Sequence, residues 1–101
     1  MKKYRIELSA DAYEDIEDTL EWLAERSGDA PYRWYSGIMK AMGSLDEDPG
    51  RCGLAREDKY FRDELRQMVI CNYRIVFTIR KDAAFVTRVR HTARLPYLSE
   101  E

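Results

Sequence analysis

The chain has 101 residues, a formal net charge of −2 and 45% hydrophobic residues. This length suits one domain, residues 1–101, with one modest core. No stretch is long and apolar enough to span a membrane, and Met1-Lys2-Lys3 does not begin a signal peptide. The two cysteines, Cys52 and Cys71, form no CxxC pair, so we expect a cytoplasmic protein with reduced thiols.

The net charge hides an asymmetry between the two halves of the chain. Residues 1–50 hold 6 Lys or Arg against 12 Asp or Glu, whereas residues 51–101 hold 11 against 7. Such a contrast favours an acidic partner or nucleic acid for the basic half. The alternative is that acidic helices and a basic sheet solvate or pair with each other. The overall negative charge argues against a general DNA-binding module, because phosphate binding needs a broad basic surface.

The first half of the chain predicts a strand and two helices. Residues 4–8 alternate apolar and polar side chains, which is typical of a half-buried strand. Ser9 can cap a following helix, expected from about Ala10 to Arg26. Asp29 can cap a second helix, expected over residues 30–45. Their apolar stripes comprise Ala12, Ile16, Leu20 and Leu23, then Trp34, Ile38, Ala41, Met42 and Leu45. A short connection predicts that these helices pack as an antiparallel hairpin.

The second half predicts a turn, an unassigned segment and three strands. Proline and glycine break the periodicity at residues 46–52, and residues 54–63 are irregular and highly charged. Strands are expected over residues 65–70, 73–79 and 84–90, joined by turns at residues 71–72 and 81–82. Short turns make such strands antiparallel. The predicted fold class is therefore α+β, in the order strand, helix, helix, strand, strand, strand, with the helix hairpin on one face of the sheet.

This order of elements resembles the RelE/ParE superfamily of toxins from type II toxin–antitoxin modules. The resemblance covers nearly the whole chain. It rests on the opening strand followed by Ser9-Ala10-Asp11-Ala12, and on Leu45 with Pro49-Gly50. It continues with Leu65-Arg66, with Asn72-Tyr73-Arg74-Ile75-Val76-Phe77, and with Val89-Arg90-His91 followed by Arg94. No single motif is specific, whereas their order and spacing together are.

The superfamily implies two styles of action. RelE-like members cleave messenger RNA on the ribosome, and ParE-like members poison DNA gyrase. In a nuclease of this kind, the resemblance places Arg74, His91, Arg94 and Tyr97 as candidate catalytic residues. RNA cleavage by the 2′-hydroxyl needs a proton acceptor, a proton donor and positive charge at the phosphate. The strand over residues 65–70 has no lysine, and an arginine such as Arg66 is a poor base because it stays charged.

The pattern from His91 to Leu95-Pro96 is more similar to the ParE-like branch. The resemblance then implies a toxin of a plasmid-stabilisation module that binds DNA gyrase and is neutralised by a cognate antitoxin. Binding would use a set of basic residues: Arg66, Arg74, Arg90, His91 and Arg94. Instead of binding a partner, each arginine could solvate the sheet or pair with the acidic helices. His91 could instead make a local hydrogen bond at a strand end.

Three functional alternatives stay open at this point. They are a gyrase-binding toxin, a ribosome-dependent endoribonuclease acting on mRNA, and a decayed relative that still binds an antitoxin. The antitoxin's flexible segment is expected to dock as an amphipathic helix or an added strand, in a groove between the helix hairpin and the sheet. No metal or organic cofactor is implied, because His91 is the only histidine and no phosphate-binding loop is present. A homodimer and a toxin–antitoxin hetero-oligomer are both compatible with the sequence.

Overall fold

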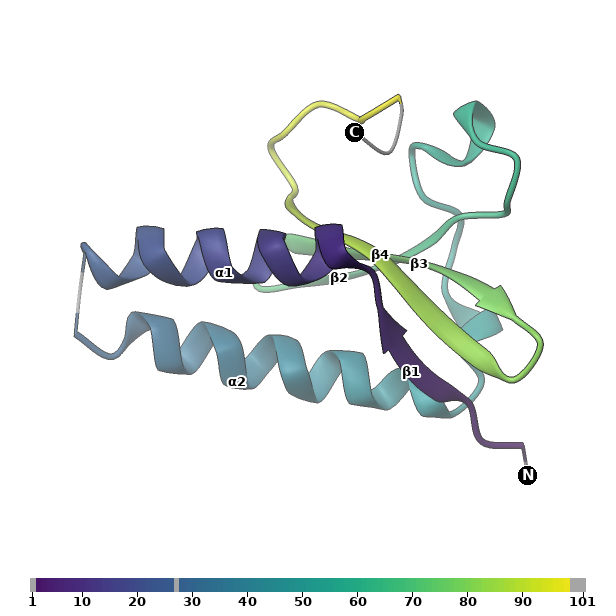
Figure 1. Ribbon diagram of the computed structural model, residues 1–101, viewed down its shortest axis with the longest axis horizontal. Coiled ribbons are helices and arrows are strands. Elements are labelled where there is room, and N and C mark those ends of the chain that lie inside the picture. Colours follow the sequence, from purple (N-terminus) through teal and green to yellow (C-terminus); the bar gives the residue numbers. More distant parts are fainter. Residues whose placement is uncertain (1, 27, 99–101) are drawn as a thin grey trace.

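The computed structural model describes residues 2–26 and 28–98. The elements follow the predicted order: β1 (Arg5–Leu8), α1 (Ala10–Ala24), α2 (Ala30–Gly43), β2 (Arg66–Ile70), β3 (Tyr73–Arg80) and β4 (Ala83–His91). Short 3-10 turns lie between α2 and β2. The fold is α+β, and the two helices run antiparallel beside the sheet, as Figure 1 shows. Among the described residues, no helix is long and apolar enough to cross a membrane.

The sheet has the strand order β1-β4-β3-β2. The last three strands form the predicted antiparallel meander, while β1 pairs in parallel with β4. Sequence patterning left the partner of β1 undefined. The parallel pair places the last strand of the chain in the interior of the sheet, between β1 and β3.

A β-bulge interrupts the alternation of β4. Val76 pairs with Arg88 and Phe77 with Val86, which leaves Thr87 as an extra residue in β4. Because of this residue, Val86 and Val89 both reach the helix-side core, although they are three positions apart. The bulge lies where β1 ends, since the Ser9 amide donates to the Val86 carbonyl at 2.9 Å.

The helix starts follow their predicted signals only in part. Ser9 caps α1, and its Oγ accepts the Ala12 amide at 3.0 Å. Asp29 makes no side-chain cap to α2 and pairs instead with Arg33 at 3.4 Å. The helix α1 also ends at Ala24 rather than near Arg26.

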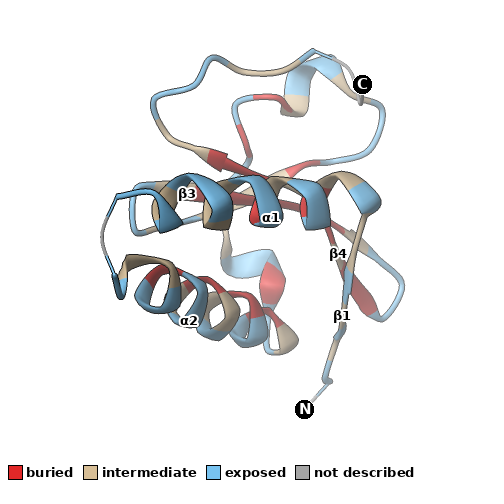
Figure 2. Ribbon diagram, turned by 60° about the vertical axis from the view of Figure 1, so that its left-hand side comes forward, coloured by how far each residue is buried: buried red, intermediate tan, exposed pale blue. Residues whose placement is uncertain are grey.

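The sheet is covered on both faces. On one face, the stripes of α1 and α2 pack with Ile75, Phe77 and Val86 into the main core. On the other face, residues 53–64, here named the cover segment, pack through Ala55 onto Val76. Residues 92–98, here named the C-terminal strap, lie on that same face through Tyr97. Figure 2 shows the buried positions on the sides of the helices and strands that face one another.

Candidate partner-binding surface

An apolar groove lies at the tip of the helix hairpin, next to the β2–β3 turn. Its volume is about 410 Å³. The end of α1, the start of α2, the turn at residues 71–72 and the end of β4 contribute its walls. The lining residues are Trp22, Leu23, Ala30, Arg33, Trp34, Cys71, Asn72, Tyr73 and His91. This groove occupies the place predicted for partner docking, between the hairpin and the sheet.

Local geometry brings the aromatic side of this groove together. Cys71 and Asn72 have φ values of 52° and 64°, which suits a two-residue hairpin turn between β2 and β3. Tyr73, the first residue of β3, lies opposite His91 in the β3–β4 register. The Tyr73 ring then meets Trp34 edge-on at 5.1 Å and His91 edge-on at 5.0 Å between centroids. The groove wall is therefore a connected row of three rings.

His91 makes the local hydrogen bond that the sequence offered as its alternative role. Its Nδ1 accepts the Ala93 amide at 3.0 Å. Together with Arg90 and the exposed Arg94, His91 also lines a small neighbouring hollow of about 110 Å³ that contains Asp15. His91 thus lies between the apolar groove and a charged hollow, and Arg94 on that hollow is exposed.

Arg90 lies mostly under the strap. Its side chain is 8% exposed, and Nη2 donates to the Leu95 carbonyl at 2.9 Å. Burial lowers the pKa of Arg90, and the nearby charges of Arg94 and Arg88 lower it further. A guanidinium in this state offers little to a partner while the strap is in place.

Arg74 is fully buried on the same face. Its Nη1 and Nη2 each donate at 2.8 Å to one oxygen of the Glu57 carboxylate, and Nη1 also donates to the Gln67 Oε1 at 3.0 Å. Both partners of this ion pair have no exposed surface. In this arrangement Arg74 reaches neither a phosphate nor a carboxylate of another molecule.

Glu57 comes from the cover segment, which the sequence left unassigned. Burial would raise the pKa of Glu57, but the hydrogen bonds and charge of Arg74 outweigh burial and hold the pKa below its ordinary value. The second oxygen of Glu57 also accepts the Tyr97 amide at 3.3 Å. One carboxylate therefore ties together the cover segment, β3 and the strap.

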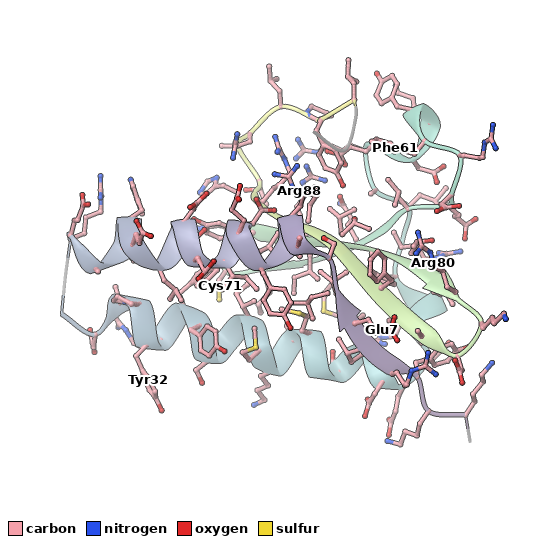
Figure 3. The ribbon with its side chains drawn as sticks, in the orientation of Figure 1. Glu7, Tyr32, Phe61, Cys71, Arg80 and Arg88 are labelled. Carbon is pink, nitrogen blue, oxygen red and sulfur yellow. The ribbon has the colours of Figure 1, made fainter. Side chains whose placement is uncertain are left out.

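Tyr97 is the inward-pointing residue of the strap. Its ring meets Phe61 edge-on at 5.6 Å, and the guanidinium carbons of Arg90 and Arg88 lie 4.9 and 5.3 Å from its centroid. Burial raises the pKa of the Tyr97 phenol. Phe61 and Arg88 lie on the side of the sheet away from α2, as the labelled side chains in Figure 3 show.

Arg66 lies apart from the other predicted residues. Its Nη1 donates to the Cys52 carbonyl and its Nη2 to Glu64 at 2.9 Å. Met68 and Ile70, which follow Arg66 at every second position along β2, pack on the helix-side core. Arg74 of β3 lies on the opposite face of the sheet. The structure therefore brings His91, Arg90 and Arg94 together, buries Arg74 on the sheet face onto which Tyr97 of the strap packs, and leaves Arg66 elsewhere.

Sequence reasoning missed two acidic partners. Asp15 of α1 accepts both Arg88 Nε at 2.8 Å and Nη2 at 2.9 Å, and also the Val89 amide at 2.9 Å. Arg88 thus takes the alternative role of pairing with an acidic helix. The sequence did carry a signal for Asp15, because this acid directly precedes Ile16 in the apolar stripe of α1 and so lies at the edge of the face that packs on the sheet. Glu57 carried no comparable signal, because its segment has no periodicity.

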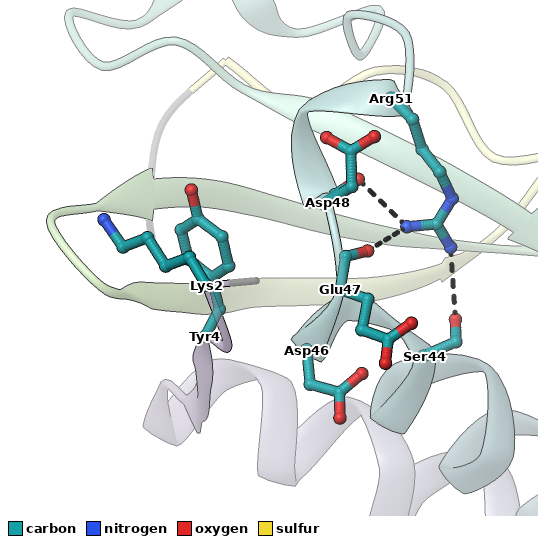
Figure 4. Close-up of a pocket in the computed structure, with 7 residues that line it drawn as sticks. All are labelled: Lys2, Tyr4, Ser44, Asp46, Glu47, Asp48 and Arg51. Carbon is teal, nitrogen blue, oxygen red and sulfur yellow. Dashed lines mark hydrogen bonds between the residues drawn. The ribbon is translucent and has the colours of Figure 1, made fainter.

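A wider hollow of about 820 Å³ lies at the other end of α2, near the chain's N-terminus. Three consecutive acids, Asp46, Glu47 and Asp48, line it, and Arg51 donates to the carbonyls of two of them (Figure 4). Its acidic character does not match the predicted basic surface.

Residues 6–96 match the family model of the ParE toxin of the type II toxin–antitoxin system parDE. The chain belongs to this family. No curated protein matches the chain. Membership in the ParE toxin family supports a toxin role and implies a cognate antitoxin as partner. The matched range runs from Ile6 in β1 through β4 to Pro96 of the strap, so the apolar groove and most of the covered sheet face lie within the ParE toxin domain.

Proposed function

We propose that this ParE family toxin acts by binding DNA gyrase and is neutralised when its antitoxin docks in the groove at the hairpin tip. The observation that carries the choice of binding over RNA cleavage is the Glu57–Arg74 pair. Both charged nitrogens of Arg74 that could face a phosphate are taken by an internal carboxylate at 2.8 Å.

The remaining nuclease candidates support the same choice. His91 accepts a hydrogen bond from the Ala93 amide through Nδ1, and Tyr97 of the strap points inward with its hydroxyl buried. Arg94 is exposed on a separate hollow with His91. These groups do not converge on one open site, whereas general acid–base cleavage requires a base and an acid on opposite sides of the same phosphate.

The groove suits an antitoxin segment with an apolar anchor flanked by acids. Trp22, Trp34 and Tyr73 supply an aromatic surface for the anchor. Arg33 lines the rim, and Arg94 lies on the adjoining hollow. Such a segment would fold on binding, burying apolar side chains while its carboxylates meet the arginines.

Two experiments test this proposal. The chain is expressed in bacteria with and without the small gene expected beside it, and growth arrest only in the absence of that gene is the expected result. The purified toxin is then added to gyrase and relaxed plasmid, where we expect supercoiling to stop.

A translation extract separates the alternative. Cut messenger in the extract, together with normal supercoiling at high toxin excess, would overturn gyrase binding in favour of RNA cleavage. Unaffected growth without the antitoxin would instead identify a decayed, non-toxic relative.

A further inference from the structure

The C-terminal strap is held to the sheet mainly by polar contacts. The Thr92 amide donates to the Asn72 carbonyl at 2.8 Å, and the Thr92 carbonyl accepts Arg56 Nη2 at 3.1 Å. Further along, the Leu95 carbonyl accepts from Arg90 and the Tyr97 amide donates to Glu57. Main-chain groups of the strap take part in all four of these contacts.

The strap buries few of its own apolar side chains. Leu95 and Leu98 are 82% and 66% exposed. Tyr97 alone is packed by both the cover segment and the arginines of β4. Since burial of apolar surface is the main force that holds a segment in place, the strap depends on one ring and a few hydrogen bonds.

The face beneath the strap has more donors than acceptors. Arg74 and Arg90 are directly opposite each other on β3 and β4. Two carboxylates at this face are already occupied, Asp15 by Arg88 and Glu57 by Arg74. Among the described residues, the buried Nε atoms of Arg74 and Arg90 have no hydrogen-bond partner.

Buried donors without acceptors are unfavourable, most of all when they are charged. A ligand that brought additional carboxylates to this face would satisfy these donors better than the strap does.

From this mismatch we infer that the strap is a replaceable internal occupant, and that the face beneath it is a second interaction surface for an acidic peptide segment of a protein partner. The segment would place an aromatic ring in the slot of Tyr97, beside Phe61, and a carboxylate against Arg90. A peptide fits better than nucleic acid, because the strap already shows main-chain groups paired with Arg90 and Glu57.

This surface is separate from the apolar groove, and its use does not depend on which cellular target the toxin binds. The two surfaces lie on opposite faces of the sheet: the groove shares Trp34 with the helix-side core, and Tyr97 belongs to the cluster on the other face. An acidic peptide could therefore bind under the strap while another partner fills the groove.

The test compares two strap variants of the full chain, Tyr97→Ala and Leu95→Ala. The probe is a fluorescent peptide of glutamates around a single tyrosine, followed by anisotropy. Loosening the strap raises the fraction of chains in the open state, so we expect Tyr97→Ala to bind the peptide about tenfold more tightly than the wild type. Leu95→Ala, whose side chain is exposed, should bind like the wild type. Adding Arg90→Gln to Tyr97→Ala should remove the gain.

A second measurement uses the wild-type chain and does not depend on how the variants fold. Hydrogen exchange of the Thr92 and Tyr97 amides should accelerate when the peptide is present in excess. The inference is overturned if Tyr97→Ala folds but gains no affinity, if the peptide leaves both amides protected, or if it binds none of the chains. If Tyr97→Ala gained more affinity for a single-stranded oligoribonucleotide of equal charge than for the peptide, the inference would also be overturned. The face would then be assigned to nucleic acid.

Discussion

Glu57 and Arg74 face each other through two parallel hydrogen bonds of 2.8 Å, with both side chains fully buried. The pair joins the cover segment to the third strand of the sheet. Its bidentate geometry is the arrangement in which an arginine and a carboxylate bind most strongly. Because both charges are shielded from water, neither can be removed alone without leaving the other buried and unpaired.

We predict that Arg74→Met lowers the free energy of unfolding by about 3–5 kcal/mol, because the Glu57 carboxylate then has no counter-charge. Urea unfolding followed by circular dichroism measures this loss. The double variant with Glu57→Gln should recover much of it. Arg33→Met, which removes an exposed pair with Asp29, serves as the control and should change stability by less than about 1 kcal/mol. If Arg74→Met and Arg33→Met lowered the free energy of unfolding equally, the buried pair would contribute no more to stability than an exposed one.

The same pair predicts a loss of stability in acid. The pKa of Glu57 is lowered in the folded state, so the unfolded chain binds a proton more readily than the folded chain. The stability from this carboxylate is therefore present at neutral pH and is lost below about pH 5, as the pH falls toward the lowered pKa. Urea midpoints measured at several acidic pH values should fall less steeply for Glu57→Gln than for the wild type. Parallel pH curves would argue against this assignment.

Asp15 should matter for the β4 bulge. Asp15→Asn removes the negative charge that faces Arg88 and weakens the acceptor of the Val89 amide. We predict a loss of about 1.5–3 kcal/mol, typical of hydrogen bonds that involve a charged group. Amide exchange at Val89 should accelerate together with this loss. The exposed Asp18 on the same helix provides the matched control, and Asp18→Asn should leave both quantities unchanged.

Trp22 allows the groove to be tested without disturbing the core, because its side chain is half exposed. If the antitoxin docks there, Trp22→Ala should weaken toxin–antitoxin binding by about 30-fold or more, as truncation of an aromatic hot-spot residue does. Calorimetry with the purified antitoxin measures the change. Tyr32 is also on the hairpin but points away from the groove into solvent (Figure 3), so Tyr32→Ala is the control. A similar loss for both variants would place the antitoxin elsewhere.

Most of the architecture could be predicted from local patterns. The stripes of both helices and the alternation in the last three strands depend on side-chain period, and the observed bounds differ from the predicted ones by two residues or fewer at every end. The parallel pairing of β1 with β4 could not be predicted in this way. It joins residues such as Ile6 and Ala84, and no short-range signal specifies a contact over that separation.

The candidate site was less predictable than the fold. Arg74 was expected to bind a partner, to solvate the sheet or to pair with an acidic helix, yet it is buried and paired with Glu57 of the cover segment. An arginine at an alternating strand position has the same pattern whether the face it points to is solvated or covered. The aperiodic segment over residues 53–64 covers this face. The burial of Arg74 could therefore be recognised only from the structure, which shows where that segment lies.

The interior position of β4 has a consequence for how the protein is made. This strand contacts β1, β3 and α1, and it is the last of the four strands along the chain. A growing polypeptide therefore holds its first strand and both helices without the strand that completes their sheet until β4 has been made. A nonsense mutation anywhere before Ala83 would leave a chain unable to assemble this sheet.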